Sequence, residues 1–377
     1  MLASDLWLRL QHFVGDVLRG RLGRLSIHVL TTGDFRTLLA LSKDDATAWR
    51  EISGGLEPRL LFSVRNRKEF FISLLTSLQS YDHILDEADA ELSPPLRVHD
   101  DRRLMRCDHV WRLGKAYWIA RNGSYVRAFE RKTVGPENAF QDQKERERFS
   151  VLDLSIRSIN MVTGFMFFSD SPALGPSFWL SYSAVLFGQV RSLRRIFGSG
   201  RVPVVHRFAA GVAVLIAGVY FSNVGQGRRW VEDAYRSLVR DCAKSIGPTG
   251  EIRECGYPEQ LFVAEALTMV LAAGSRSWFD VPGEIGKALR RMHGFLGESA
   301  HADGTFPLPG SPDDSRIIPD PIATQGPYVP SFLHAASVLT DIPPRFEPWG
   351  TFNQVSLWLL GAEGFETYRR SASSARF

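Results

Sequence analysis

Four short segments of the 377-residue sequence hold the side chains best suited to chemistry. Arg157 and Asn160 lie three residues apart in the first segment, and His206 opens a long apolar run in the second. Tyr257 ends the third segment, GEIRECGY, and the fourth is the stretch His301–Arg316, HADGTFPLPGSPDDSR. Imidazole and phenol groups move protons, and a guanidinium group binds a carboxylate through two parallel hydrogen bonds. These residue types suit proton transfer and anion binding.

Motifs of several other chemistries are absent from the sequence. It contains no GxGxxG, GxxxxGK[ST], HExxH or GxSxG pattern, so nothing supports nucleotide binding, a zinc protease or a serine-hydrolase elbow. Three cysteines, Cys107, Cys242 and Cys255, lack paired spacing, which excludes a disulfide scaffold and a zinc ribbon and favours a reducing compartment. The formal net charge of only +4 excludes a strongly polybasic nucleic-acid binder but leaves a mild preference for acidic partners.

The elements that must position these residues are helices. Period-two alternation is rare, and apolar residues recur at spacings of three and four. Helices are therefore expected over the following ranges: 152–168, 178–197, 208–221, 230–246, 261–271, 285–296 and 352–360. Short breakers such as Gly247–Gly250 separate them, so neighbouring helices are expected to be antiparallel and to form a ring or a layered stack of hairpins.

The most membrane-like run of the sequence is shorter than a transmembrane helix. The run Phe208–Phe221 has only 14 residues, fewer than the roughly 20 that cross a bilayer, and is expected to be a buried helix.

Residues 1–97 are expected to form an N-terminal helical extension with a helix over Glu69–Asp89. The first residues lack a basic start and a small-residue cleavage site, so no signal peptide is predicted.

The order of the four segments resembles the helical toroid domain of the heparinase II/III-like polysaccharide lyases, a group that also contains several alginate lyases. Val151–Asn160 is similar to a family helix that carries an Arg and, three residues later, an Asn. Val205–His206 stands where the family usually has Asn-His, Gly250–Tyr257 resembles "DGG, then Glu, then Tyr", and His301–Arg316 resembles "PDG, then Pro, then GDSDDGR". The resemblance implies an all-α fold, an incomplete (α/α) toroid of antiparallel helical hairpins, over residues 98–377.

The sequence departs from the family pattern at two positions. Val205 replaces the usual Asn, and the usual Tyr-His pair falls on Glu259 and Gln260. Tyr257 takes the place of that tyrosine if the turn is shifted by two residues. Family members continue into a C-terminal β-sandwich that supplies a further His, so the resemblance implies a separately encoded β-sandwich subunit as a partner.

The resemblance implies β-elimination on an acidic, uronate-containing polysaccharide or oligosaccharide. This reaction needs a group that neutralises the sugar carboxylate, a base for the neighbouring proton and an acid for the leaving oxygen. The implied catalytic residues are His206 and Tyr257. The implied substrate-binding residues are Arg157, Asn160, Glu254, Glu259 and Gln260. The residues expected to order the loop, rather than to hold a metal, are His301, Asp303, Asp313, Asp314 and Arg316.

Each of these residues also has a purely structural interpretation. His206 would then be a polar residue at a helix start, and Tyr257 an aromatic side chain packed on the rim of the toroid. Arg157 and Asn160, one helical turn apart, would anchor neighbouring helices by hydrogen bonds.

Two functions from different classes therefore stay open. The first is a polysaccharide lyase that uses no metal or other cofactor. The alternative is a catalytically inactive toroid that binds glycans or assists exopolysaccharide assembly. Neither needs nucleic acid or a membrane span. The lack of a signal peptide predicts a cytoplasmic location, whereas the resemblance implies a periplasmic one.

Overall fold

The computed structural model describes residues 30–54, 82–93, 102–135, 149–197, 202–253, 255–275, 277, 279–301, 316–318, 332–341 and 354–374. Within these ranges every regular element is a helix and no strand occurs. The helices are α2 (Thr32–Leu39), α3 (Asp45–Ser53), α5 (Asp82–Ala90), α6 (Arg102–Met105), α7 (His109–Ala120), α8 (Gly123–Thr133), α10 (Val151–Phe168), α11 (Pro176–Phe197), α12 (Val204–Tyr220), α13 (Gln226–Ser245), α14 (Tyr257–Gly274), α15 (Gly283–Ser299), α16 (Leu333–Thr340) and α17 (Gln354–Ser374).

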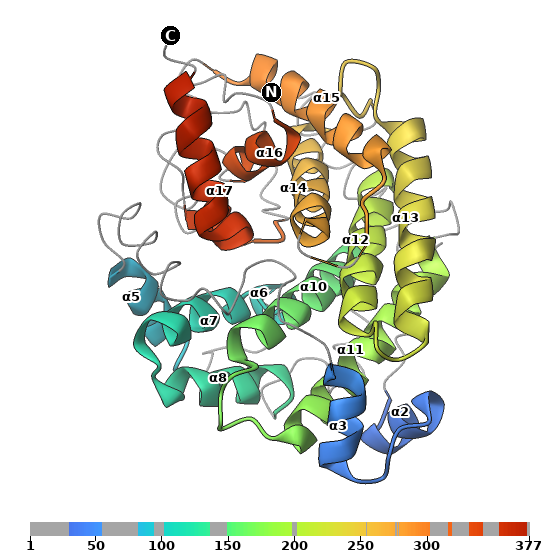
Figure 1. Cartoon of the computed structure of the whole chain (residues 1–377), viewed down its shortest axis with the longest axis vertical. Helices are drawn as coiled ribbons and strands as arrows, with labels where there is room; N and C mark the ends of the chain where they lie inside the picture. Colours follow the sequence, from blue (N-terminus) through green and yellow to red (C-terminus); the bar gives the residue numbers. More distant parts are fainter. Residues whose placement is uncertain are drawn as a thin grey trace, which may run out of the picture.

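Helices α7, α10, α12 and α14 form the inner layer of a ring, each packed on the next (Figure 1). Of these, α12 and α14 are apolar almost all round, and every residue of α10 is buried. A helix that is apolar all round is stable only when protein surrounds it, which explains the inner position. Among the described helices α10 alone is long and apolar enough to cross a membrane, and it lies wholly inside the protein.

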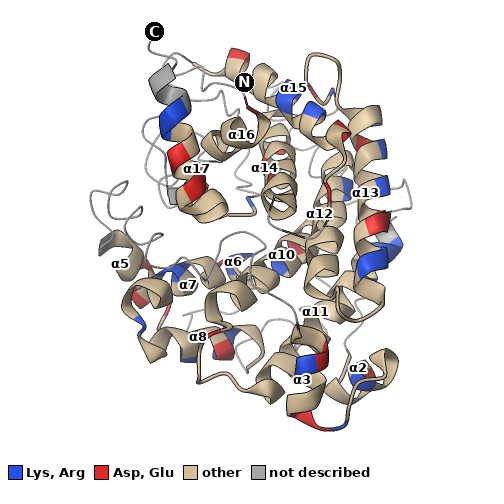
Figure 2. Ribbon diagram, in the orientation of Figure 1, with Lys and Arg blue, Asp and Glu red and all other residues tan. Residues whose placement is uncertain are grey.

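The outer layer consists of helices that alternate with the inner ones along the chain. α8 packs on α7, α11 on α10 and α12, α13 on α12, and α15 on α14. Figure 2 shows that charged residues gather on α13, whereas its inner neighbour α12 carries almost none. The chain therefore repeats one unit, an antiparallel hairpin with one buried and one amphipathic helix.

The last hairpin brings the end of the chain back to its first inner helix. The indole of Trp358, in α17, lies 5.8 Å from the ring of Trp118 in α7 and 5.2 Å from that of Phe167 in α10. Trp118 donates a hydrogen bond from Nε1 to the carbonyl oxygen of Phe167 at 2.9 Å. An aromatic cluster thus joins α17, α7 and α10.

The helices that precede residue 97 share the same core. Phe35 of α2 is fully buried, with its ring 5.4 Å from that of Phe187 in α11. Trp49 of α3 stacks on Trp179 of α11 at 5.8 Å. The boundary between an extension and the toroid at residues 97 and 98 stays a prediction, and residues 69–81 of the predicted helix Glu69–Asp89 lie outside the described residues.

The connection between α13 and α14 shows how one glycine sets a turn. Gly250 has a φ of +103°, and a Cβ atom there would lie 2.1 Å from the carbonyl oxygen of Arg291 in α15. A side chain at this position would meet both backbone strain and a direct clash. The turn therefore needs glycine in order to seat the start of α14 against α15.

The all-α fold predicted from the sequence is confirmed, as is the burial of the run Phe208–Phe221. The seven predicted helices correspond to α10 to α15 and α17. Most of the segment between His301 and Pro330 lies outside the described residues.

Candidate functional site

Arg157 and Asn160, both in α10, are fully buried and bond to the backbone at the end of α6 and in the turn that follows it. Arg157 Nη1 donates to the carbonyl oxygen of Met105 at 3.1 Å, and Asn160 Nδ2 donates to that of Arg106 at 2.9 Å. Asn160 Oδ1 accepts a hydrogen bond from Trp111 Nε1 at 2.9 Å. These contacts fix the start of α7 against α10. The substrate-binding role predicted for both residues stays a prediction.

The first turn of α10 is tied to the same place. Asp153 and Ser150 form a capping box, in which Ser150 Oγ accepts from Asp153 N at 3.0 Å. Arg106 Nε lies 2.7 Å from Asp153 Oδ1 in a buried ion pair. Burial opposes the ionisation of Asp153, but the Arg106 charge and the hydrogen bonds from Ser150 outweigh it and hold the Asp153 pKa below its usual value.

His206 is the third residue of α12 and is half-buried. The next residue, Arg207, faces α13, where its Nε lies 3.1 Å from Asp241 Oδ1, and it donates from Nη1 to the carbonyl oxygen of Val202 at 2.9 Å. Consecutive helical side chains point about 100° apart. The Arg207 anchor therefore fixes the rotation of the helix start and with it the direction of His206.

Tyr257 is the first residue of α14, where Gly256 and Pro258 start the helix. Its ring is half-buried and stacks on Phe295 of α15, with centroids 6.2 Å apart and planes at 15°. Glu259 is exposed two residues later, in the first turn of the helix.

Gln260, in the same turn as Tyr257, is buried. Its Oε1 accepts from Ile252 N at 3.1 Å, and its Nε2 donates to the carbonyl oxygen of Cys255 at 3.4 Å. Gln260 thus holds the turn before α14. Its predicted substrate-binding role stays a prediction.

A buried carboxylate that the sequence analysis missed, Glu265, anchors the chain just after the fourth segment. Its two oxygens accept hydrogen bonds from the backbone nitrogens of Ile317 and Ile318, at 3.1 and 2.9 Å. Glu265 lies two turns after Tyr257 in α14, about 12 Å along the axis. The half-buried Arg316 is therefore held next to the helix that Tyr257 begins. The sequence signal that could have identified Glu265 is its single charge inside the apolar run LFVAEALTMVLAAG.

The other residues of the third and fourth segments are placed only in part. His301 is exposed, two residues after the end of α15. Glu254, Asp303, Asp313 and Asp314 lie outside the described residues. Within the described part of the chain, no group of three or more His, Cys, Asp or Glu side chains could hold a metal ion.

A second missed group lies at the start of α7. His109 is 2% exposed, and within the described chain neither of its ring nitrogens has a hydrogen-bond partner. Burial lowers the His109 pKa to about 3. Nearby, Glu91 receives hydrogen bonds from Arg112 Nη1 and Lys132 Nζ, each at 2.6 Å. The four residues of this group, Glu91, His109, Arg112 and Lys132, are spread over 42 positions of the sequence, so no local sequence pattern predicts that they lie together.

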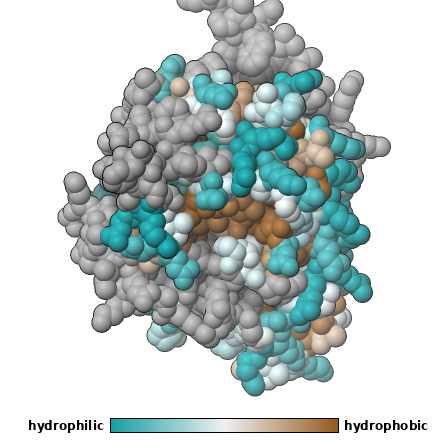
Figure 3. All heavy atoms as spheres, turned by 45° about the horizontal axis from the view of Figure 1, so that its top comes forward, coloured by the Kyte–Doolittle hydropathy of each residue, from teal (hydrophilic) through white to brown (hydrophobic). Residues whose placement is uncertain are grey.

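The direction of the inner helices brings the candidate residues to one end of the ring. Each of α10, α12 and α14 is followed by an antiparallel outer helix, so the three run the same way. His206 and Tyr257 both stand in first turns and share that end, while Arg157 and Asn160 lie deeper along α10. Figure 3 shows one face of the molecule with a hollow whose hydrophobic floor is bordered by hydrophilic residues.

Comparison with known proteins supports the fold. No protein-family model matches the sequence, and no curated protein matches it. The solved structure of heparan sulfate lyase HepC from Pedobacter heparinus is similar, with a TM-score of 0.50, 16% identity, and coverage of 72% of this chain and 45% of that one. A HepC mutant gives a TM-score of 0.50, 16% identity and coverage of 74% and 45%. The heparinase III-BT4657 gene product gives 0.47, 16%, 62% and 42%.

These similarities establish a fold and no more. The ring of helical hairpins is the helical toroid that the sequence predicts, and this chain spans less than half the length of HepC. At 16% identity neither the reaction nor the substrate carries over.

Proposed function

We propose that this protein is a polysaccharide lyase that cleaves an acidic, uronate-containing polysaccharide by β-elimination. The observation that carries the proposal is the common end of the inner ring, where first turns of α12 and α14 hold the half-buried His206 and Tyr257. The fold shared with a heparan sulfate lyase supports a uronate polymer as the substrate class.

The proposed reaction divides three tasks between two side chains. His206 neutralises the carboxylate of the sugar, which makes the adjacent C5 proton acidic enough to remove. The phenolate form of Tyr257 takes that proton, and the phenol then returns it to the 4-linked oxygen as this oxygen leaves with the bonding electron pair. The electrons of the broken C5–H bond form the C4–C5 double bond. Atoms and electrons balance in this reaction without an oxidant, a metal or a cofactor.

The position of Gln260 supports Tyr257 rather than Glu259 as the residue at the family's tyrosine position. Gln260 is turned inward and bonded to the backbone of the preceding turn, whereas the Tyr257 ring stays half-exposed on α15. For Tyr257 to stand at the family's tyrosine position, the turn before α14 must be shifted by two residues relative to the family pattern.

The experiment is an elimination assay on heparan sulfate, alginate and a bacterial exopolysaccharide. Each cleavage creates a double bond conjugated to the carboxylate, which absorbs in the ultraviolet. We expect one of these polymers to give the product, and His206→Ala to reduce its rate by at least about 100-fold with an unchanged circular dichroism spectrum. If the wild-type protein yields no unsaturated product from any of them, alone or with a co-purified β-rich subunit, the lyase proposal fails.

One observation favours the alternative, a toroid that binds glycans without cleaving them. The residue that aligns with the family's His after the tyrosine is Gln260, which is buried and engaged with Ile252 and Cys255. An amide cannot transfer protons at neutral pH. Glycan binding without turnover, equally strong in His206→Ala, would support this alternative.

A further inference from the structure

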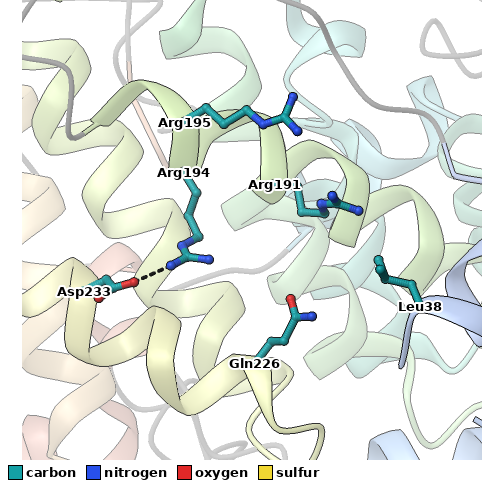
Figure 4. A pocket seen from close by; sticks show the side chains of 6 residues that line it. All are labelled: Leu38, Arg191, Arg194, Arg195, Gln226 and Asp233. Atoms are coloured by element: carbon teal, nitrogen blue, oxygen red, sulfur yellow. Dashed lines mark hydrogen bonds and ion pairs between the residues drawn. The ribbon is translucent and has the colours of Figure 1, made fainter. Parts of the chain in front are cut away.

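A cavity of about 400 Å³ lies between α2, α11 and α13, away from the helix starts that hold His206 and Tyr257. Its lining comes from three outer elements and from no helix of the inner layer (Figure 4). The lining residues are Leu38, Arg191, Arg194, Arg195, Gln226 and Asp233. The lining thus holds three guanidinium groups and one carboxylate, and of the three only Arg194 is directed at Asp233 in Figure 4.

The spacing of the arginines explains why all three reach the cavity. Residues 191, 194 and 195 are three and four positions apart, so they share one face of α11. Arg194 lies 5.9 Å from the centre of the Trp230 ring in α13, and this indole is fully buried. The Trp230 indole packs against the Arg194 guanidinium from the protein interior, and the charge of Arg194 stays at the surface.

Asp233, the one carboxylate among the lining residues, is already bonded to arginine side chains. Asp233 receives hydrogen bonds from Arg194 and from Arg236, which lies outside the cavity. Arg191 forms no hydrogen bond or ion pair within the described part of the chain, and in Figure 4 it lies between Arg194 and Leu38. Arg191 therefore offers the cavity a guanidinium fork whose charge no carboxylate of the described residues neutralises.

We propose that this cavity binds a segment of an acidic oligosaccharide through its carboxylate or sulfate groups. The proposal rests on the proposed function, because it assigns a second contact with the same polymer far from the point of cleavage. Arg191 and Arg194 take the anionic groups, the Gln226 amide bonds to sugar hydroxyls, and the 40%-exposed Leu38 contacts the C–H face of a ring. The volume falls within the range of small-molecule sites.

The lining argues against a nucleic acid as the ligand. Proteins that bind single strands stack bases on exposed aromatic side chains. The cavity has none, since the nearest indole, Trp230, is fully buried beneath Arg194.

The test measures binding of two fluorescent hexasaccharides, one from heparin, which carries sulfate and carboxylate groups, and one from alginate, which carries carboxylates alone. All variants are made in the full chain with His206→Ala, so that no cleavage interferes. Arg191→Ala/Arg194→Ala removes two charges from the cavity. Arg50→Ala/Arg127→Ala removes two charges from exposed positions on α3 and α8 and is the matched control.

We expect the cavity variant to bind at least one of the hexasaccharides about tenfold more weakly, since each charge-assisted contact is strong, and the control to bind like its parent. The hexasaccharide with the larger loss identifies sulfate or carboxylate as the preferred group. Arg191→Glu, which leaves the Arg194–Asp233 pair intact, should produce the same loss and guards against a folding defect.

Two results would overturn the proposal. One is equal affinity of the parent, the cavity variants and the control for both sugars. The other is a single-stranded DNA oligonucleotide that binds the cavity more tightly than either sugar. The outcome is separable from the proposed function, because a loss of affinity in the cavity variants supports the site even if the His206-containing protein forms no unsaturated product.

Discussion

Two regions of the inner ring use polar residues in opposite ways. Near the start of α7, the side chains of Arg157, Asn160 and Asp153 are buried and bonded to backbone or to an opposite charge. At the starts of α12 and α14, His206 and Tyr257 are half-exposed. The first arrangement fixes helices relative to one another, and the second leaves the two side chains partly exposed. Substitutions should therefore cost stability in the first region and activity in the second.

The largest expected effect on stability comes from Arg157→Met. Methionine fills much of the space but leaves the buried carbonyl oxygens of Leu104 and Met105 without the Arg157 donor. We expect the free energy of unfolding to fall by about 3 kcal/mol. Urea denaturation measures it, with the exposed Arg127→Met as control. If the two variants are equally stable, Arg157 is not the anchor that its contacts indicate.

The next effect is a pH dependence that belongs to the buried region. Burial lowers the His109 pKa to about 3, so the unfolded chain binds a proton at a higher pH than the folded chain. Stability contributed by neutral His109 is therefore present above the unfolded pKa of roughly 6.5 and is lost as the pH falls below it. Between pH 6.5 and pH 5 the loss should reach about 2 kcal/mol.

Urea denaturation at pH 7 and pH 5 tests this pH dependence. His109→Gln should reduce the difference between the two pH values, whereas the same change at the exposed His301 should not. A His109→Gln variant that keeps the full wild-type pH dependence would show that another group is responsible.

The sequence predicted most of the toroid because apolar residues recur at helical spacing in the inner helices α10, α12 and α14. Gly256, Pro258 and Gly274 delimit α14, and helical periodicity located α10 to α13. Helices α7 and α8 were not predicted. In α7, the buried Lys115 interrupts the apolar pattern, and its position over the Trp111 ring at 5.9 Å depends on the fold.

The candidate site was predictable only as a set of residue types. The sequence placed His206 at a helix start and Tyr257 in the turn before a helix, but it could not show that Gln260 is buried or that Arg157 bonds to the backbone of residues 104 and 105. These contacts join segments up to 53 positions apart. Side-chain direction and partner depend on packing that no local pattern encodes.

A smaller effect is expected at Glu265, in the middle of α14. In Glu265→Gln, one oxygen is replaced by an amide nitrogen that cannot accept, so either Ile317 N or Ile318 N loses its bond. We expect a loss of about 1–2 kcal/mol. Limited proteolysis should also cut near residue 316 sooner than in wild type. If the cutting rate and stability match those of wild type, Glu265 does not anchor this segment.

The smallest effect on stability is expected for Tyr257→Phe, together with a large effect on turnover. The variant keeps the stack on Phe295, so the free energy of unfolding should change by less than about 0.5 kcal/mol. It loses the only atom that moves a proton in the proposed reaction, so kcat should fall about 100-fold while KM stays near the wild-type value. Phe295→Leu is the reverse control, because it weakens the stack and retains the hydroxyl. If Tyr257→Phe turns over like wild type and Phe295→Leu does not, Tyr257 acts only as a packed aromatic side chain, and the proton passes through another group.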